Sequence, residues 1–134
     1  MKLEVGQFAR LKSGYICKII NINDFREPNM KYGVEANYLK DVMFIGDDDV
    51  VKASYNIIDI LECGDYLNGF KVSEIERYDT NTIIKIGNST FNVLEGEKIY
   101  TPSYDNNNGY EKIEKLKSIV THEQMEKMAY KVGE

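Results

Sequence analysis

Short runs of alternating hydrophobic and polar residues, interrupted by Gly, Asn, Asp and Ser, cover most of this chain. The pattern is typical of many short β-strands joined by tight turns. In the first half we expect strands at residues 7–12, 15–23, 32–39, 42–45, 50–53 and 57–61. In the second half we expect them at 70–78, 82–86, 90–94 and 98–100. The chain is therefore predicted to be mainly β, or α+β overall once its C-terminal segment is counted.

Two stretches of the sequence match each other. Leu3-Glu4-Val5-Gly6-Gln7-Phe8 aligns with Leu61-Glu62-Cys63-Gly64-Asp65-Tyr66, and each is followed by a turn and an Ile/Val-rich strand. A glycine before an aromatic strand, a tight turn and such a strand are similar to the opening of SH3-like small barrels. We expect two SH3-like β units, at residues 1–62 and 63–112. A chance match of common hairpin residues is the alternative to a duplication.

The C-terminal part, residues 113–134, has a different pattern. Residues 116–120 predict a strand, and Thr121 with Gln124 three positions later forms the signature of a helix N-terminus. Met125, Met128 and Ala129 share one face at helical spacing, which predicts a short helix over residues 122–130 that packs on the β core. The polar stretch 101–109 before it predicts the most flexible loop.

Composition and charge narrow the class of protein. The chain has 134 residues, 43% of them hydrophobic, and 17 basic residues against 22 acidic ones give a net charge of -5. An acidic surface is a poor partner for a phosphate backbone, so direct nucleic-acid binding is not expected. No stretch reaches the roughly 18 apolar residues of a membrane span and no signal peptide is visible, so we expect a cytoplasmic protein without a membrane partner.

The residues able to carry chemistry are few. Cys17 and Cys63 lie far apart within apolar segments, and His122 is the single histidine, so a zinc site is not expected and both thiols are predicted to be buried. No phosphate-binding glycine motif or nucleophile motif occurs. His122, at a predicted helix start, is interpreted as an ordinary surface residue. We therefore expect a protein with no catalytic residue, no metal and no cofactor.

Two segments are candidate partner-binding sites. The first is the acidic trio Asp47, Asp48 and Asp49, which lacks the other ligands of a calcium loop and is otherwise a solvated turn. The second is the Asn-rich loop with Tyr104, Asp105 and Tyr110, because Tyr, Asn and Ser in a loop are typical of binding surfaces. Most other aromatic residues are expected in the β core.

Residues 51–69 (VKASYNIIDILECGDYLNG) and 117–126 (KSIVTHEQME) resemble segments of small proteins from phages, prophages and mobile elements of clostridia-like Firmicutes. Many of those proteins carry Val in place of Cys63 and Phe in place of Met125. The resemblance implies an accessory protein of a mobile element, and it provides no functional residue to transfer.

Within that setting we expect a non-enzymatic protein that binds a protein partner, for example an inhibitor of a host defence protein such as a CRISPR nuclease. The alternatives are a small-ligand binder that sequesters a nucleotide signal and a structural component of a phage particle. A basic pocket of Arg10, Lys12 and Lys18 would favour the small ligand. A flat acidic and aromatic face would favour the protein partner.

Overall fold

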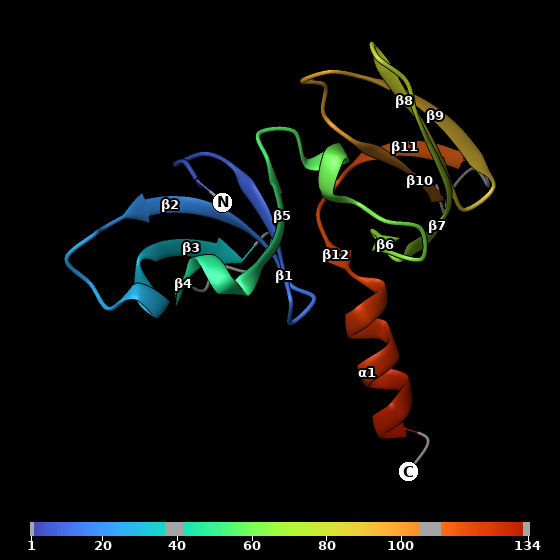
Figure 1. Ribbon diagram of the computed structural model, residues 1–134. Helices are drawn as coiled ribbons and strands as arrows, with labels where there is room; N and C mark the ends of the chain where they lie inside the picture. The colour runs from blue at the N-terminus through green and yellow to red at the C-terminus, as the bar shows by residue number, and fades with distance from the viewer. Residues whose placement is uncertain (1, 37–41, 105–110, 133–134) are drawn as a thin grey trace. The chain divides into compact units, whose positions relative to one another are not determined.

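The computed structural model describes residues 2–36, 42–104 and 111–132. Within them the chain forms twelve β-strands, three 3₁₀ helices and one α-helix (Figure 1). The prediction of a mainly β chain with one short C-terminal helix is confirmed. The sheets are open ones, and the strand pairings of the described residues do not close a barrel.

Contacts divide the chain into two compact units. Unit 1 comprises residues 1–61 together with 123–134, and unit 2 comprises residues 62–122. The last strand, β12 (Ile119–Val120), therefore belongs to unit 2, whereas all but the first residue of helix α1 (His122–Val132) belongs to unit 1.

Unit 1 is a five-stranded antiparallel sheet in the order β4-β3-β2-β1-β5. The strands are β1 (Phe8–Leu11), β2 (Ile16–Ile22), β3 (Tyr32–Ala36), β4 (Val42–Ile45) and β5 (Val50–Ser54). Short 3₁₀ helices, η1 (Pro28–Met30), η2 (Asp47–Asp49) and η3 (Ile57–Ile60), follow β2, β4 and β5. The core is formed by Leu3, Ala9, Leu11, Cys17, Ile19, Tyr32, Val34, Ile45 and Val50.

Helix α1 is held to unit 1 by a buried charge. Arg10 in β1 is only 1% exposed, and its guanidinium donates to Glu123 Oε2 at 2.7 Å and to the Ile60 carbonyl at 3.2 Å. Lys127 Nζ donates to the Ser13 carbonyl at 3.0 Å one turn further along the helix. Met125 is half-buried, as expected for the helix face that contacts the sheet.

Unit 2 contains a second five-stranded sheet and a separate two-stranded one. The large sheet has the order β12-β6-β7-β8-β9, with β6 (Tyr66–Leu67), β7 (Phe70–Arg77), β8 (Asn81–Ile86) and β9 (Ser89–Leu94). Strands β10 (Tyr100–Tyr104) and β11 (Glu111–Lys115) pair only with each other among the described residues. The buried side chains of unit 2 include Leu67, Val72, Ile84, Ile86, Val93, Ile99 and Leu116.

The matching sequences fold in the same way. In each unit the first strand pairs with both the second and the last strand of the five-stranded sheet. Gly6 and Gly64 precede those first strands with φ of +96° and +94°, a conformation that glycine adopts without strain. Their N–H groups donate to the carbonyls of Ile19 and Val72, both at 2.8 Å. A register shift follows at the same point of each second strand, after Ile19 and after Val72.

A side chain closes the same turn in both units. The Gln7 side chain accepts from the Glu4 N–H at 2.8 Å, and the Asp65 carboxylate accepts from the Glu62 N–H at 2.8 Å. The match between residues 3–8 and 61–66 is therefore a shared local structure in the two units.

Some sequence-based expectations are wrong in detail. The apolar run 57–61 is the 3₁₀ helix η3, because the Asn56 side chain accepts from the Ile58 N–H and starts a turn there. The segment 101–104, predicted as loop, continues strand β10. The predicted strand 116–120 is limited to β12. Cys17 is buried, and burial raises its pKa to about 12, whereas Cys63 is exposed.

Candidate functional site

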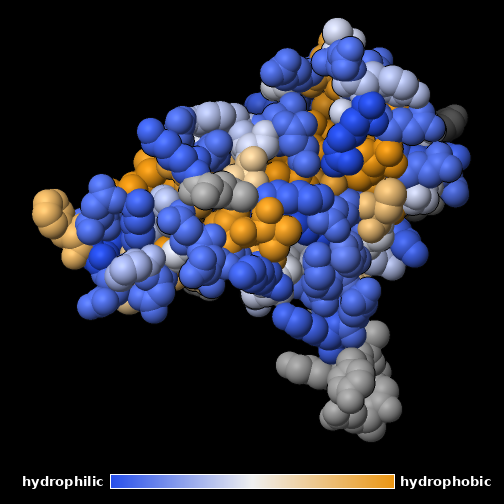
Figure 2. Space-filling model, in the orientation of Figure 1, coloured by the Kyte–Doolittle hydropathy of each residue, from blue (hydrophilic) through white to orange (hydrophobic). Residues whose placement is uncertain are grey.

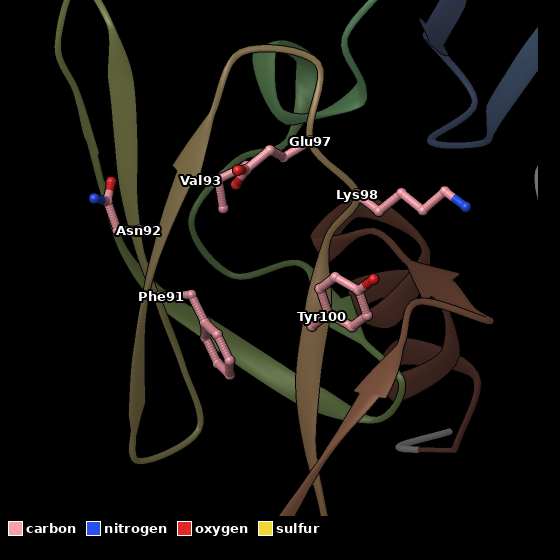
Figure 3. Close-up of a pocket in the computed structure, with 6 residues that line it drawn as sticks. All are labelled: Phe91, Asn92, Val93, Glu97, Lys98 and Tyr100. Carbon is pink, nitrogen blue, oxygen red and sulfur yellow. The ribbon is translucent and has the colours of Figure 1, made fainter.

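A pocket of about 310 Å³ lies along one edge of the large sheet of unit 2 (Figure 3). It is lined by three consecutive residues of β9, two residues of the segment before β10 and the first residue of β10: Phe91, Asn92, Val93, Glu97, Lys98 and Tyr100. Successive residues of a strand point to opposite faces, so a pocket lined by three in a row must follow the strand's edge. The pocket is thus a slot beside β9.

The walls of this slot are aromatic. The rings of Phe91 and Tyr100 lie on opposite sides of it in Figure 3, one from β9 and one from the start of β10. Tyr100 is 44% exposed, Phe91 is half-buried and Val93 is buried. Figure 2 shows hydrophobic residues at the surface, bordered by hydrophilic ones. An apolar group placed between the two rings would be shielded from water on both of its faces.

The backbone fixes the shape of the slot. The chain reverses between Leu94 and Glu97, where the Glu97 N–H donates to the Leu94 carbonyl at 3.0 Å. The Glu97 carboxylate in return accepts from the Leu94 N–H at 3.2 Å. Ile99 is buried, and its carbonyl accepts from the Leu116 N–H at 3.1 Å, which holds the segment before β10 in place. Backbone hydrogen bonds therefore hold the chain on this side of the slot.

The edge of β9 carries backbone groups that face away from the sheet. The Tyr78 N–H donates to the Asn81 carbonyl at 2.8 Å, so Asn81 faces β7. Because direction alternates along a strand, Thr82, Ile84 and Ile86 face β9, and their β9 partners are Val93, Phe91 and Ser89.

The remaining residues of β9, namely Thr90, Asn92 and Leu94, present their N–H and C=O groups to the outside. Those of Leu94 bond Glu97. Within the described part of the chain, no group hydrogen-bonds to the outward backbone groups of Thr90 and Asn92. The slot therefore has two pairs of open backbone donors and acceptors along one side.

The two charges of the slot have different surroundings. The Glu97 carboxylate accepts from the Leu94 N–H, as described above. For Lys98 the described residues supply no hydrogen-bond or ion-pair partner, and Figure 3 shows its side chain extending away from the aromatic rings. The rim of the slot thus carries a cation that the described residues leave unpaired.

His122 has a more defined setting than an ordinary surface residue. Its Nε2 lies 2.9 Å from Glu62 Oε1, both side chains are about 30% exposed, and its N–H donates to Asp65 Oδ1 at 3.0 Å. Asp65 itself is fully buried. Within unit 2 this pair offers one nitrogen and one oxygen to a metal ion, which is fewer ligands than a four-coordinate zinc site uses.

The acidic trio of the sequence is largely engaged by the fold of unit 1. Asp47 Oδ1 accepts from the Tyr32 hydroxyl at 2.6 Å, and Asp49 Oδ2 accepts from the Gly46 N–H at 2.9 Å. Burial and the bond to Asp47 raise the pKa of Tyr32. Asp48 is exposed in η2. The trio therefore caps a 3₁₀ turn as well as presenting acidity to solvent.

The Asn-rich candidate loop is described only at its start. Tyr104 is the last residue of β10, the strand that begins with Tyr100 of the slot. Asp105 and Tyr110 lie outside the described residues.

The basic residues that would favour a small anionic ligand have different surroundings. Arg10 is buried and bonded to Glu123, whereas Lys18 is exposed and lies over the Phe8 ring at 5.7 Å. A second, open pocket of about 510 Å³ in unit 1 is lined by Lys2, Leu3, Ile22, Asp24, Lys31, Tyr32 and Asp47. Most of its polar groups are paired, with Lys31 on Asp24 at 3.3 Å and Tyr32 on Asp47.

Comparison with known proteins adds no relative: no family model, curated protein or solved structure matches this chain. Over the described residues, no helix has the length and apolar character needed to cross a membrane.

Sequence reasoning assigned Phe91 and Tyr100 to strands but gave them no binding role. Their role depends on β9 being an edge strand, and the hydrophobic pattern does not predict the order of strands in a sheet. An aromatic residue in each of two strand segments separated by a Gly-containing turn is the signal that could have pointed to them.

Proposed function

We propose that this protein acts by binding a protein partner, through the slot between β9 and the start of β10. The observation that carries the proposal is the pair of aromatic walls, Phe91 and Tyr100, beside an open strand edge. Aromatic residues are enriched at the centres of protein interfaces. The resemblance to phage and mobile-element proteins supports an accessory role, with inhibition of a host defence protein such as a CRISPR nuclease as the proposed consequence.

The chemistry of the slot supports a binding role over a catalytic one. It is lined by one carboxylate, one ammonium group, an amide, a phenol and two apolar side chains. Nucleophilic catalysis needs a nucleophile within hydrogen-bond reach of a base, and the carboxylate here accepts from a backbone N–H. The burial of Arg10 also weighs against the alternative of a nucleotide-binding protein, because it removes one of the three cations of the basic pocket expected for that role.

We further propose that both units are SH3-like in topology. Support comes from the sheet order in each unit, where the first of five antiparallel strands pairs with the second and with the last. The 3₁₀ helix η2 between β4 and β5 of unit 1 also fits this topology.

The test is capture of a partner from a host-cell lysate with the full chain, compared with Phe91→Ala and Tyr100→Ala. Tyr78→Ala is the matched control, because Tyr78 is an exposed tyrosine of the same unit outside the slot. We expect one protein to be captured by the wild type and by Tyr78→Ala, and to be lost from both slot variants while their circular dichroism spectra stay unchanged. Equal capture by all four proteins would contradict the proposal.

A titration against the captured partner tests the non-enzymatic part. The effect on the partner should saturate at a fixed molar ratio, and His122→Ala should behave as the wild type once its fold is verified. If a small fraction of one equivalent processes many partner molecules, and His122→Ala abolishes this, the protein is an enzyme.

A further inference from the structure

We infer that the partner contributes an extended segment that adds to β9 as an extra strand and places an apolar side chain between Phe91 and Tyr100. The inference rests on the proposed function and specifies the chemistry of the partner at that same slot. It predicts a short linear motif on the partner, recognised through its backbone.

The backbone groups call for an extended peptide. Thr90 and Asn92 stand two residues apart, and each directs one N–H and one C=O outward, which offers four backbone hydrogen bonds to a neighbouring strand. A small molecule seldom matches such a spaced row of donors and acceptors, whereas a β-strand does so by its repeat. Strand addition at an exposed sheet edge is an established mode of peptide recognition.

The side-chain pattern selects one apolar residue. Phe91 lies between Thr90 and Asn92 and points to the opposite face of β9, the face that also carries the buried Val93. The partner residue opposite Phe91 must point to that face too, and there it meets Phe91 and Tyr100. At about 310 Å³ the slot is at the lower end of the range for small-molecule pockets, roughly 300–1,000 Å³, which suits one bulky side chain and its neighbours.

Charge complementarity gives the motif a second feature. Lys98 lines the slot without a described partner, and the Glu97 carboxylate accepts from the Leu94 N–H. An acidic residue near the apolar one on the partner would pair with Lys98 at the rim. The favoured motif is therefore a large apolar residue with Asp or Glu within two positions, in a segment free of proline.

The corresponding edge strand of unit 1 has a crowded end. Strand β4 leads into Gly46, where an added Cβ would lie 2.6 Å from the Pro28 carbonyl oxygen and 2.8 Å from the Asn29 Cα, so η1 packs directly against this end of β4. In unit 2 the end of β9 turns at Gly96 instead, and a Cβ added there would have no atom within 4 Å. The two units share a strand order but differ in how closely the chain is packed where this edge strand ends.

The first experiment selects binders from a random dodecapeptide library displayed on messenger RNA, with the full wild-type chain as bait and Phe91→Ala as counter-bait. We expect enriched peptides that combine a large apolar residue with a nearby acidic one. Failure to enrich any peptide on the wild type over the counter-bait overturns the inference.

The second experiment replaces each amide N–H of the best peptide, one at a time, by N-methyl. A strand added to β9 has N–H groups that alternate between β9 and solvent, so affinity should fall about tenfold at positions of one parity and stay unchanged at the other. Because the protein is unaltered, this result does not depend on how a variant folds. Tolerance of methylation at every position, or sensitivity without alternation, overturns the inference.

Protein variants probe the same bonds from the other side. Thr90→Pro and Asn92→Pro each remove one outward N–H without touching the ladder to β8, and edge strands tolerate proline at such positions. Thr90→Ala and Asn92→Ala are the matched controls, the latter also because the Asn92 side chain accepts from Asn81. We expect about tenfold weaker peptide binding for each proline variant and at most threefold for the alanine controls. Equal losses in the two sets contradict strand addition.

The two levels of the proposal fail separately. If the lysate partner depends on Phe91 and Tyr100 yet tolerates both proline variants and no peptide is enriched, the slot binds a folded surface, and strand addition is wrong while the binding function stands. If capture itself ignores Phe91 and Tyr100, the proposed function fails. If the wild type instead retains a small molecule and no protein, both are wrong.

Discussion

Asp65 is expected to be the most sensitive polar position of unit 2. Its side chain is fully buried, and its two oxygens serve two segments that lie 60 residues apart in the sequence. Oδ2 accepts from the Glu62 N–H at 2.8 Å at the turn before β6, and Oδ1 accepts from the His122 N–H at 3.0 Å at the start of helix α1. Asp65→Ala leaves both backbone donors without this acceptor.

The size of the effect follows from the two bonds. A hydrogen bond to a charged group contributes about 1.5–3 kcal/mol. Both donors of Asp65 are partly buried, so water restores a share of each bond. We expect Asp65→Ala to lower the free energy of unfolding by about 2–4 kcal/mol. Asp65→Asn retains one carbonyl oxygen and should lose about half as much.

Urea unfolding followed by far-UV circular dichroism measures this change, because the chain has no tryptophan to report by fluorescence. Gln7→Ala is the matched control, since Gln7 occupies the same position in the turn of unit 1 and accepts from Glu4 in an exposed setting. Gln7→Ala should lower the free energy of unfolding by less than about 1 kcal/mol. If Asp65→Ala is no more destabilising than Gln7→Ala, the role given to the buried carboxylate is wrong.

Three further changes test the fold. Gly46→Ala should destabilise the protein by more than about 2 kcal/mol in the same urea assay, because its Cβ would lie 2.6 Å from a carbonyl oxygen of η1. Glu123→Gln should cost about 1–3 kcal/mol by weakening the charged bond to the buried Arg10, and a melting temperature equal to that of the wild type would contradict the anchoring of helix α1. A thiol reagent at pH 8 should modify Cys63 quickly and Cys17 only after unfolding, since burial raises the Cys17 pKa to about 12. The ionisation of Cys17 in the unfolded chain should then lower stability as the pH rises from its ordinary pKa of 9.0 towards 12, an effect that Cys17→Ala removes.

The turns and the helix can be predicted from the sequence because each depends on residues that are close together in the chain. A glycine is needed where φ is positive, so Gly6 and Gly64 marked the same turn in both units. Asn68-Gly69 has φ of +50° and +84°, the conformation of a two-residue hairpin turn that this pair favours. The helix after Thr121 was predicted for the same reason, since its start and its apolar face lie within a few residues.

Errors arose where the hydrophobic pattern leaves more than one local structure open. The run from Ile57 to Ile60 is apolar without alternation, a pattern that does not separate a strand from a buried turn, and the Asn56 side chain settles the choice. Cys63 lies in an apolar segment but is exposed, at the turn that Gly64 makes before the buried Asp65.

Most of the strands, the C-terminal helix and the recurrence of one turn at residues 3–8 and 61–66 can be predicted from the sequence, because they follow from periodicity and from the conformations open to Gly and Asn. Which strand lies at the edge of each sheet is known from the fold alone, since hydrogen bonds between strands join residues far apart and every strand carries the same backbone donors and acceptors. The aromatic slot therefore had to be found in the fold. Phe91 and Tyr100 look like ordinary strand residues until β9 is seen to end its sheet.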